Sequence, residues 1–421
     1  MPWRCAGFAR DSPTGLFLVL MVGLRLSCAI AAGVLCAGWT LSASASEDLG
    51  SRVRSHLRPG EIAYVVGDNE IPLLAIGATR SFVPASTLKV FTALLVREHL
   101  GFDARFRTEF HLVDGWVVVR GFGDPYLVSE EITRAAAGLA ARLSGVAPVG
   151  VAVDDSYFEE GLRVPGVGTS RNPYDAHNSA LAVNFNTIHV RRVGNAYVSA
   201  EPQTPITPTA IAVARRHGIR GTERLNLGHS PEEIRRHAAQ VLAIKLREAG
   251  LKVGDGIAAR QVPGDSRPIY IHESSRTVGE NVAAMLEFSN NYIANQLFLA
   301  VGAAAQGPPA TVEKSVRTAK RYIAERPDLL GMVVAEGSGI SRSNRATPSA
   351  LASVLARFEQ DRMLLPLEDG VPHKTGTLRD VRSLVAYLDS AEHGTVRVVI
   401  WMDGSGHQRR WRVLEQLEKS L

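Results

Sequence analysis

The chain has very little cysteine. Of its 421 residues only three are cysteines, and Cys5, Cys28 and Cys36 all lie within the first 45 residues. If this segment is a cleaved leader, the mature chain contains no disulfide and no thiol group. The near absence of cysteine therefore excludes a thiol nucleophile and disulfide stabilisation in the mature protein.

The sequence also lacks the patterns of a metal enzyme and of a nucleic-acid-binding protein. Its twelve histidines are scattered, and no His-x-x-x-His pair stands beside a glutamate, which argues against a metal hydrolase. The net charge of +5 is too small to indicate a nucleic-acid partner. We therefore expect no metal, no other cofactor and no nucleic acid.

No uninterrupted apolar run reaches the roughly 20 residues that a membrane span needs. A first apolar stretch follows two arginines and is interrupted by Arg25, and a second stretch covers 29–41. The small residues of Ala43-x-Ala45 then predict cleavage by signal peptidase after Ala45. We interpret 1–45 as a secretory signal peptide that directs export across the inner membrane. The alternative is an uncleaved leader, which would then anchor the protein to the membrane.

Hydrophobic patterns in the rest of the chain predict an α/β protein. Strands are expected near both chain ends, and helices with one apolar face lie between them. This arrangement predicts a mixed sheet that is covered by helices on both faces. The expected strands are 62–66, 72–76, 381–388 and 395–402, and the expected helices are 84–100, 278–287, 291–303, 348–358 and 408–421.

The middle of the chain has a different pattern. Short strand-like runs with glycine and proline turns begin near Phe106, and an amphipathic helix is expected at 231–249. We therefore predict an accessory domain, 106–262, that is inserted into a first domain made of 46–105 and 263–421.

The first candidate site is Ser86-x-x-Lys89, at the start of a predicted helix. The two side chains lie one helical turn apart and share a face. The helix N-terminus favours developing negative charge at Ser86. A serine hydroxyl needs a base beside it to attack, and Lys89 serves as that base only if burial or a nearby cation lowers its pKa. The alternative is an ordinary helix start with one exposed lysine.

The second candidate site is Ser289-x-Asn291, between two predicted helices. In this link the Ser289 hydroxyl could face a cleft, and the Asn291 amide could hold Lys89 and a peptide group of a substrate. The alternative is that Ser289 and Asn290 simply cap the second helix, which is common for these residue types.

The third candidate site is Lys374-Thr375-Gly376, which precedes a strand-rich region. A strand edge with a cation, a hydroxyl and a residue without a side chain can hold a peptide that ends in a carboxylate, because glycine allows close backbone approach. The backbone N–H groups of Ser86 and Thr377 would then form an oxyanion hole. The alternative is a plain turn before a strand.

With these three motifs in this order, the sequence resembles the class C low-molecular-mass penicillin-binding proteins, the D-alanyl-D-alanine carboxypeptidase/endopeptidase family (peptidase family S13). The likeness extends over about 60–390 and includes four further segments that are similar to landmarks of the family. These segments are Gly121-Phe-Gly-Asp-Pro-Tyr-Leu, Val153-Asp-Asp-Ser-Tyr-Phe, Leu181-Ala-Val-Asn-Phe-Asn and Glu336-Gly-Ser-Gly-Ile-Ser-Arg-Ser-Asn-Arg. Arg379 departs from the family, which often has an uncharged polar residue there.

The resemblance implies a penicillin-binding, β-lactamase-like transpeptidase domain and a periplasmic enzyme that removes the terminal D-Ala from peptidoglycan stem peptides. It also implies cleavage of cross-links as a possible second activity and β-lactam antibiotics as covalent inhibitors. The implied roles are acylation for Ser86, general base for Lys89, proton relay and substrate orientation for Ser289 and Asn291, binding of the terminal carboxylate for Lys374 and Thr375, and contact with the peptide's side chain for Asp154 and Arg342.

Two other functions are compatible with the same fold. A β-lactamase would need a second base for fast deacylation, and the sequence shows no placed candidate. A peptidoglycan-binding or assembly protein without catalysis would have no evident need for all of the motif residues. The presence of the full set therefore favours a serine carboxypeptidase.

Overall fold

The computed structural model describes residues 49–404 and 407–421 of the chain. The predicted leader, 1–45, lies outside the described residues. In the part of the chain that is described, no helix is both long and apolar enough to cross a membrane.

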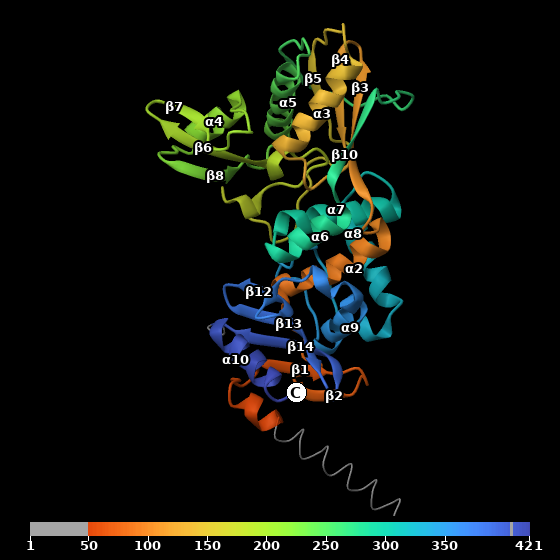
Figure 1. Cartoon of the computed structure of the whole chain (residues 1–421), viewed down its shortest axis with the longest axis vertical. Helices are drawn as coiled ribbons and strands as arrows, with labels where there is room; N and C mark the ends of the chain where they lie inside the picture. Colours follow the sequence, from red (N-terminus) through yellow and green to blue (C-terminus); the bar gives the residue numbers. More distant parts are fainter. Residues whose placement is uncertain (1–48, 405–406) are drawn as a thin grey trace, which may run out of the picture.

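The two ends of the described chain form one antiparallel sheet of six strands (Figure 1). Its order is β11-β12-β13-β14-β1-β2, so that Ile62 near the start of the chain pairs with Trp401 near its end. The strands are β1 (Ile62–Val66), β2 (Pro72–Ile76), β11 (Leu367–Glu368), β12 (Val371–Leu378), β13 (Val381–Ser390) and β14 (Gly394–Asp403).

Both faces of this sheet are covered because its central strands are apolar on both sides. On β14, Val398 and Ile400 pack with α10 (His407–Glu418), whereas Val399 points into the other layer, as expected from the alternation of side chains along a strand. That other layer contains the helices α2 (Leu88–Leu100), α6 (Val278–Glu287), α7 (Asn291–Gln306), α8 (Val312–Ala324) and α9 (Pro348–Phe358).

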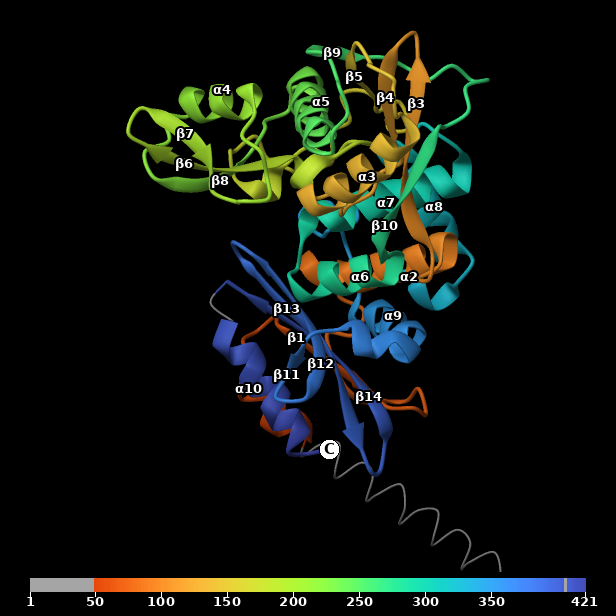
Figure 2. The same cartoon turned by 45° about the horizontal axis from the view of Figure 1, so that its top comes forward.

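The accessory part is built on a second, mixed sheet that lies beyond these helices (Figure 2). Its order is β10-β3-β4-β5-β9, with parallel pairing of β4 with β5 and of β5 with β9. Two helices, α3 (Ser129–Arg142) and α5 (Pro231–Glu248), share its apolar core. The strands are β3 (Arg105–Val113), β4 (Trp116–Gly121), β5 (Gly150–Asp154), β9 (Gly256–Ala259) and β10 (Tyr270–Thr277).

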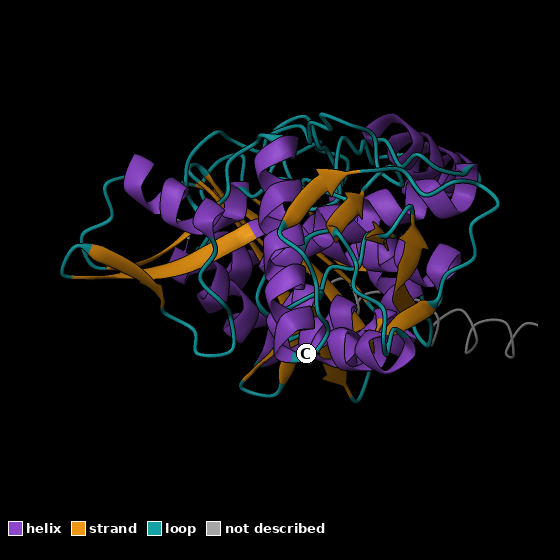
Figure 3. Ribbon diagram, turned by 90° about the horizontal axis from the view of Figure 1, so that it is seen from above, coloured by secondary structure: helices purple, strands orange, loops and turns teal. Residues whose placement is uncertain are grey.

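A smaller lobe projects to one side of the accessory part (Figures 1 and 3). It has a three-stranded antiparallel sheet, β7-β6-β8, and one helix, α4 (Pro208–Arg216), with an apolar core of its own. Its strands are β6 (Thr187–Val193), β7 (Ala196–Ser199) and β8 (Thr222–Asn226).

The predicted mixed α/β fold, a largely antiparallel sheet between helices, is confirmed. The return to the first domain, however, was placed too early at 263. Strand β10 pairs with β3 of the accessory sheet, for example His272 with Thr108, so the chain leaves that sheet only after Thr277. Strand-like runs and loops were also expected where α3 and α4 are helical, and α8 was not predicted.

Candidate active site

Ser86 lies in a tight 3-10 turn, Ala85–Thr87, directly before α2. The α-helix predicted from Pro84 onward therefore begins only at Leu88. Because residues i and i+3 eclipse in a 3-10 turn, the predicted stacking of Ser86 over Lys89 is retained. The turn is held by a 2.7 Å hydrogen bond from the Thr87 hydroxyl to the carbonyl oxygen of Pro84. Ala85 has a left-handed φ of 50°, a conformation that is costly for alanine and typical of functional sites.

The Lys89 side chain is completely buried and points at three oxygens. Its Nζ lies 2.9 Å from the Ser86 Oγ, 2.7 Å from the Asn291 Oδ1 and 2.7 Å from the carbonyl oxygen of Ser338. Burial lowers the pKa of Lys89 well below its ordinary value, and the positive charge of Lys374 lowers it further, while Glu336 opposes this shift. This amine therefore loses its proton more easily than that of an exposed lysine.

In the charged form Lys89 donates to the Ser86 Oγ, and once Lys89 has lost a proton its three contacts reverse the direction of this hydrogen bond. A neutral amine has two N–H groups and one lone pair. The amide oxygen of Asn291 and the backbone carbonyl of Ser338 only accept, so they take the two N–H groups. The lone pair is then left for the Ser86 hydroxyl, which donates to it. This is the geometry of a base that is ready to take the serine proton.

Ser338 is held in place by the buried carboxylate of Glu336. One oxygen of Glu336 accepts from the backbone N–H and the hydroxyl of Ser338, at 2.7 and 2.6 Å. The other oxygen accepts from the N–H groups of Gly339 and Ser341 and from the Asn344 amide, at 2.7 to 3.2 Å. Both oxygens of Glu336 are thus fully used in shaping the loop whose carbonyl binds Lys89.

Strand β12 brings the third motif against the nucleophile. A Cβ atom on Gly376 would lie 2.9 Å from the backbone nitrogen of Ser86 and 2.8 Å from the carbonyl oxygen of Pro84. Real Cβ atoms are practically never found this close to backbone, so the position requires glycine. Gly376 therefore allows β12 to lie directly beside the Ser86 turn.

Strand β12 pairs with β13 along one edge. Among the described residues, no strand pairs with the other edge of β12 beside Ser86, so this edge is open. The short β11 pairs only with Val371 and Pro372, and the N–H of His373 points to that side, where it donates to the carbonyl oxygen of Pro366. Because N–H groups alternate along a strand, the N–H of Thr377 points to the same edge. It is therefore placed to form an oxyanion hole with the N–H of Ser86 and to pair with an extended peptide.

Lys374 is a buried cation at this edge. Its Nζ donates to the carbonyl oxygen of Thr375 at 3.1 Å. Burial and the charge of Arg410 lower the pKa of Lys374 to about 8, while the nearby carboxylate of Glu287 opposes this shift. A cation whose Nζ makes one hydrogen bond within the described residues is suited to bind the carboxylate of a ligand.

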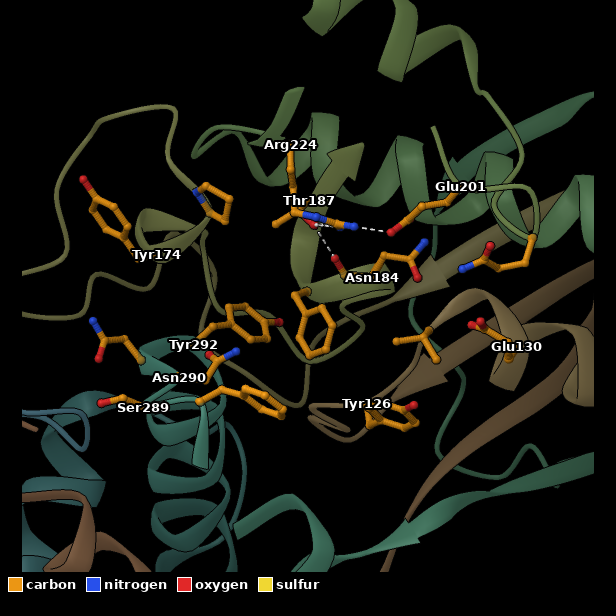
Figure 4. A pocket seen from close by; sticks show the side chains of 16 residues that line it. Tyr126, Glu130, Tyr174, Asn184, Thr187, Glu201, Arg224, Ser289, Asn290 and Tyr292 are labelled. Atoms are coloured by element: carbon orange, nitrogen blue, oxygen red, sulfur yellow. Dashed lines mark hydrogen bonds and ion pairs between the residues drawn. The ribbon is translucent and has the colours of Figure 1, made fainter. Parts of the chain in front are cut away.

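Ser289 and Asn291 have different surroundings. Asn291 contacts Lys89, but among the described residues no hydrogen bond joins the Ser289 hydroxyl to Ser86 or Lys89. Ser289 has a left-handed φ of 49° and lines a cavity together with Asn291 (Figure 4). The capping role considered for this motif belongs to Asn290, whose Oδ1 accepts from the N–H of Ile293 at 3.1 Å.

Asp154 is not brought to this cluster. Its buried carboxylate accepts from the backbone N–H and hydroxyl of Ser156 and from the N–H of Val262. It also lies 3.7 Å from the guanidinium of Arg120. These contacts stabilise the end of β5, and the substrate contact that the resemblance implies for Asp154 stays a prediction.

Arg342 lies at the rim of the strand that carries the third motif. Its guanidinium forms an exposed ion pair with Asp380, in the turn between β12 and β13. This position is compatible with contact to a peptide on β12, but the partner of Arg342 in the structure is Asp380.

Some residues that hold the site together lie outside the three sequence motifs and were not predicted. The Ser383 hydroxyl donates to the carbonyl oxygen of Pro84 at 2.6 Å. Arg410 donates to the carbonyl oxygens of Gly376 and Ser383 at 3.2 and 3.1 Å. Arg410 therefore ties β12 to β13 beside the nucleophile. An arginine within the apolar pattern of the C-terminal helix was the one sequence signal that could have indicated such a role.

Comparisons with known proteins agree with this geometry. Residues 67–372 match the model of the D-Ala-D-Ala carboxypeptidase 3 (S13) family, a range that includes the first two motifs and ends just before the third. The chain is 24% identical over 427 residues to a D-alanyl-D-alanine carboxypeptidase, DacB, of Haemophilus influenzae, with 85% of this chain and 88% of that protein covered. It is 26% identical over 335 residues to a D-alanyl-D-alanine carboxypeptidase of Actinomadura, with 65% and 60% covered.

Solved structures show the same fold. The crystal structure of penicillin-binding protein 4 from Haemophilus influenzae superposes with a TM-score of 0.70 at 19% sequence identity, and the match covers 87% of this chain and 99% of that one. A second structure of that protein, in complex with a β-lactam, gives a TM-score of 0.64 at 19% identity, over 84% and 92% of the two chains.

Proposed function

The chain belongs to the D-Ala-D-Ala carboxypeptidase S13 family, and from this we propose that Ser86 is the residue acylated during hydrolysis. The protein is a serine hydrolase of D-alanyl-D-alanine peptides. The observation that carries the assignment of Ser86 is its 2.9 Å contact with the buried amine of Lys89. Of the candidate residues, Ser86 alone combines a hydroxyl, an adjacent base and an adjacent open strand edge.

The proposed reaction begins with proton transfer. The Ser86 hydroxyl gives its proton to the lone pair of Lys89 while its oxygen attacks the carbonyl carbon between the two D-Ala residues. The N–H groups of Ser86 and Thr377 stabilise the negative charge that develops on the carbonyl oxygen. The tetrahedral intermediate collapses as the C–N bond breaks, and the proton held by Lys89 passes to the leaving amine. Water then cleaves the ester with the same residues.

The substrate is positioned by its terminal carboxylate. Lys374 supplies a buried positive charge and Thr375 a hydroxyl at the open edge of β12. We assign carboxylate binding to Lys374 and Thr375, and orientation of the peptide amide to Asn291. Peptidoglycan stem peptides are the natural substrates with this end group.

β-Lactams would acylate Ser86 because they present a strained amide and a carboxylate to the same groups. The resulting ester would be long-lived, since a fast β-lactamase needs a second base. Glu336 is the acidic group whose charge acts on Lys89, and both of its oxygens are engaged by the loop from Ser338 to Asn344. This supports a peptidase over a β-lactamase.

We place the enzyme in the periplasm, where its substrate is found. The support comes from the sequence of residues 1–45, with two apolar stretches, basic residues before each and Ala43-x-Ala45 at the end. Sequencing of the N-terminus of the exported protein tests this: a start at Ser46 agrees with the proposal, and retention of residues 1–45 contradicts it.

The pH dependence of kcat/KM is expected to report the charge of Lys374. With its pKa lowered to about 8, Lys374 is positively charged below that pH and binds the carboxylate. It loses its charge as the pH rises, so kcat/KM for a D-alanyl-D-alanine peptide should fall above about pH 8. Because kcat/KM follows the free enzyme, the profile should be measured at low substrate concentration.

The matched variant is Lys374→Arg, since arginine stays protonated throughout this range. Its absolute activity will differ, but the decline above about pH 8 should disappear. If Lys374→Arg shows the same decline as the wild type, another group is responsible and the assignment of Lys374 is wrong.

Gly376→Ala is expected to lower kcat/KM by about 100-fold, the effect of misplacing reacting groups by about 1 Å. The added Cβ would collide with the backbone of Pro84 and Ser86, so β12 must move away from the nucleophile. Hydrolysis of a D-alanyl-D-alanine peptide at low substrate concentration measures kcat/KM. Gly221→Ala is the control, because a Cβ there meets no atom within 4 Å. An active Gly376→Ala enzyme would show that close approach of β12 is not needed.

A further inference from the structure

Arg410 is a buried cation that reaches the six-stranded sheet from α10. This helix covers the face of the sheet that lies away from α2 and Ser86 (Figure 2). Arg410 is only 2% exposed, and its Nη1 donates to the carbonyl oxygens of Gly376 on β12 and Ser383 on β13. Burial and the charge of Arg382 lower the pKa of Arg410 to about 10, so the guanidinium is positively charged at neutral pH.

The carbonyl group that Arg410 contacts on β12 belongs to the same peptide group as the N–H of Thr377. The N–H and C=O groups of successive residues alternate between the two edges of a strand. Because the N–H of His373 points to the open edge of β12, the N–H of Thr377 does so as well. The C=O of Gly376 then points to β13, where Gly376 pairs with Ser383. A trans peptide group is planar, with its C=O and N–H directed oppositely, so Arg410 binds one end of the peptide group whose other end is placed to form the oxyanion hole.

A positive charge at the carbonyl end makes such a peptide group a stronger donor. The guanidinium draws electron density toward the carbonyl oxygen of Gly376, and the N–H of Thr377 becomes more positive. Successive hydrogen bonds strengthen one another in this way, and the effect is larger in a buried site of low dielectric constant. The contact also restrains the orientation of the peptide group, since glycine by itself leaves the backbone unusually free. Arg410 is thus placed to set both the strength and the direction of the Thr377 N–H.

The contact is not required to satisfy the carbonyl groups of the sheet. In the antiparallel ladder the C=O of Gly376 faces the N–H of Ser383, and the carbonyl oxygen has a second lone pair, which Arg410 uses. The attachment of α10 does not depend on Arg410 alone either, because Val413 and Leu414 are buried against the sheet. A buried cation costs free energy because it is removed from water. This cost points to a function of the charge at the site.

We propose that Arg410 is a positioning residue of the oxyanion hole. It holds the peptide group between Gly376 and Thr377 in place and strengthens the Thr377 N–H as a donor to the negatively charged oxygen of the tetrahedral intermediate. Arg410 acts through β12 and not on the substrate itself. The proposal rests on the proposed function, because it takes Ser86 as the nucleophile and Thr377 as one of the two oxyanion donors.

The test replaces Arg410 in three ways. Arg410→Met removes the charge and the donor groups, Arg410→Gln keeps neutral donors, and Arg410→Lys keeps a positive charge. Arg412→Met is the matched control, because Arg412 lies on the same helix and is exposed. Stopped-flow kinetics with benzylpenicillin separate the dissociation constant of the non-covalent complex from the rate constant of acylation. The assays are run at slightly acidic pH, where Lys374, with a pKa of about 8, is charged in every variant, since loss of the Arg410 charge can only raise this pKa.

Arg410→Met is expected to lower the rate constant of acylation about tenfold, less than the roughly 10²–10³-fold effect of removing an oxyanion donor, because the Thr377 N–H remains and is only weakened. The dissociation constant should stay within about threefold of wild type, since the carbonyl oxygen carries little charge before the attack. Arg410→Lys should regain most of the lost rate, and Arg410→Gln should not. A loss in the dissociation constant instead of the rate constant, equal rates for the lysine and glutamine variants, or a methionine variant as fast as wild type would overturn the role of Arg410.

The infrared frequency of the ester carbonyl in the acyl-enzyme reports the strength of the oxyanion donors independently of the rate. Benzylpenicillin with an isotope label at its lactam carbonyl places the label in the ester with Ser86. Weaker donors raise the C=O stretching frequency, so the frequency should be higher in Arg410→Met than in the wild type and close to wild type in Arg410→Lys. The same frequency in Arg410→Met and in the wild type would contradict a Thr377 donor that Arg410 strengthens.

The wild type and the control variant separate this proposal from the one on which it rests. If the wild type is not acylated at Ser86, the proposed function is wrong. If the wild type and Arg412→Met are acylated there and Arg410→Met reacts equally fast, only the role of Arg410 is wrong. Should Arg410→Met fail to unfold cooperatively on heating, the comparison of Arg410→Lys with Arg410→Gln provides the same test.

Discussion

Lys89→Met is expected to reduce the rate of acylation by benzylpenicillin by at least about 10³-fold, within the range measured for loss of a general base. Methionine has nearly the length of lysine but no lone pair on nitrogen to accept the Ser86 proton. The hydroxyl, 2.9 Å from the lysine Nζ in the wild type, would then face a side chain that cannot deprotonate it. The measurement is the second-order rate constant of acylation, followed by mass spectrometry.

The fold should tolerate this change because methionine is apolar and similar in length to the lysine, whose side chain is completely buried. The oxygens of Asn291 and Ser338 lose a donor, at a cost of about 1–3 kcal/mol each. Thermal unfolding should therefore still be cooperative. Lys252→Met, at an exposed position, is the control and should acylate normally. An acylation rate of Lys89→Met within tenfold of wild type would mean that another group is the base.

Ser86→Ala is expected to abolish peptide hydrolysis and acylation together. The change removes one oxygen atom from a turn that is held by the Thr87 and Ser383 hydroxyls and by Gly376, so the site should keep its shape. Without the Ser86 hydroxyl no acyl-enzyme forms. The remaining groups can still orient the substrate, but no group attacks its carbonyl carbon. Hydrolysis of a D-alanyl-D-alanine peptide, measured by released D-Ala, should be undetectable.

Binding should survive in the same variant, because Lys374 and the open edge of β12 are unchanged. The affinity of Ser86→Ala for the peptide should stay within about threefold of the wild-type affinity for a non-hydrolysable analogue, a difference below 1 kcal/mol. Ser51→Ala, on the exposed surface, should behave like the wild type in both assays. Measurable turnover by Ser86→Ala would contradict the assignment of the nucleophile.

The elements with strong local patterns could be predicted from the sequence. Strands β1 and β2 and helices α6 and α9 were predicted with the same bounds as in the structure, because each combines a clear apolar period with a turn or cap residue. Longer-range features could not be predicted. The pairing of β10 with β3 joins segments about 160 residues apart, and no local pattern reports such a partner. This is why the boundary at 262 was placed too early.

Helix α3 shows a different reason for failure. Its sequence, with Glu130 and Glu131 in the first turn and several alanines after them, is a good helix. The surrounding strand-like runs led to the expectation of strands throughout this region. A helix that crosses between the parallel strands β4 and β5 is what such a pair requires, but the parallel pairing itself could not be inferred from the sequence.

The candidate site also contains residues that could be predicted from the sequence and residues that could not. Side chains that act by their own chemistry, such as Ser86 and Lys89, could be named from motif and spacing. The groups that set their properties could not: the carbonyl oxygen of Ser338 is a backbone atom, and Glu336 acts through the loop that it folds. For Asp154 the sequence could not show that the carboxylate also accepts a hydrogen bond from the backbone of Val262, more than 100 residues along the chain.

The central claim is that Ser86 is the acylated nucleophile, and mass spectrometry after incubation with benzylpenicillin tests it most directly. The wild type should gain the mass of one penicillin molecule, the adduct should map to the peptide that contains Ser86, and Ser86→Ala should gain no mass. An adduct on any other residue, or one that persists in Ser86→Ala, would contradict the account, as would an unmodified wild type in the presence of intact or hydrolysed drug.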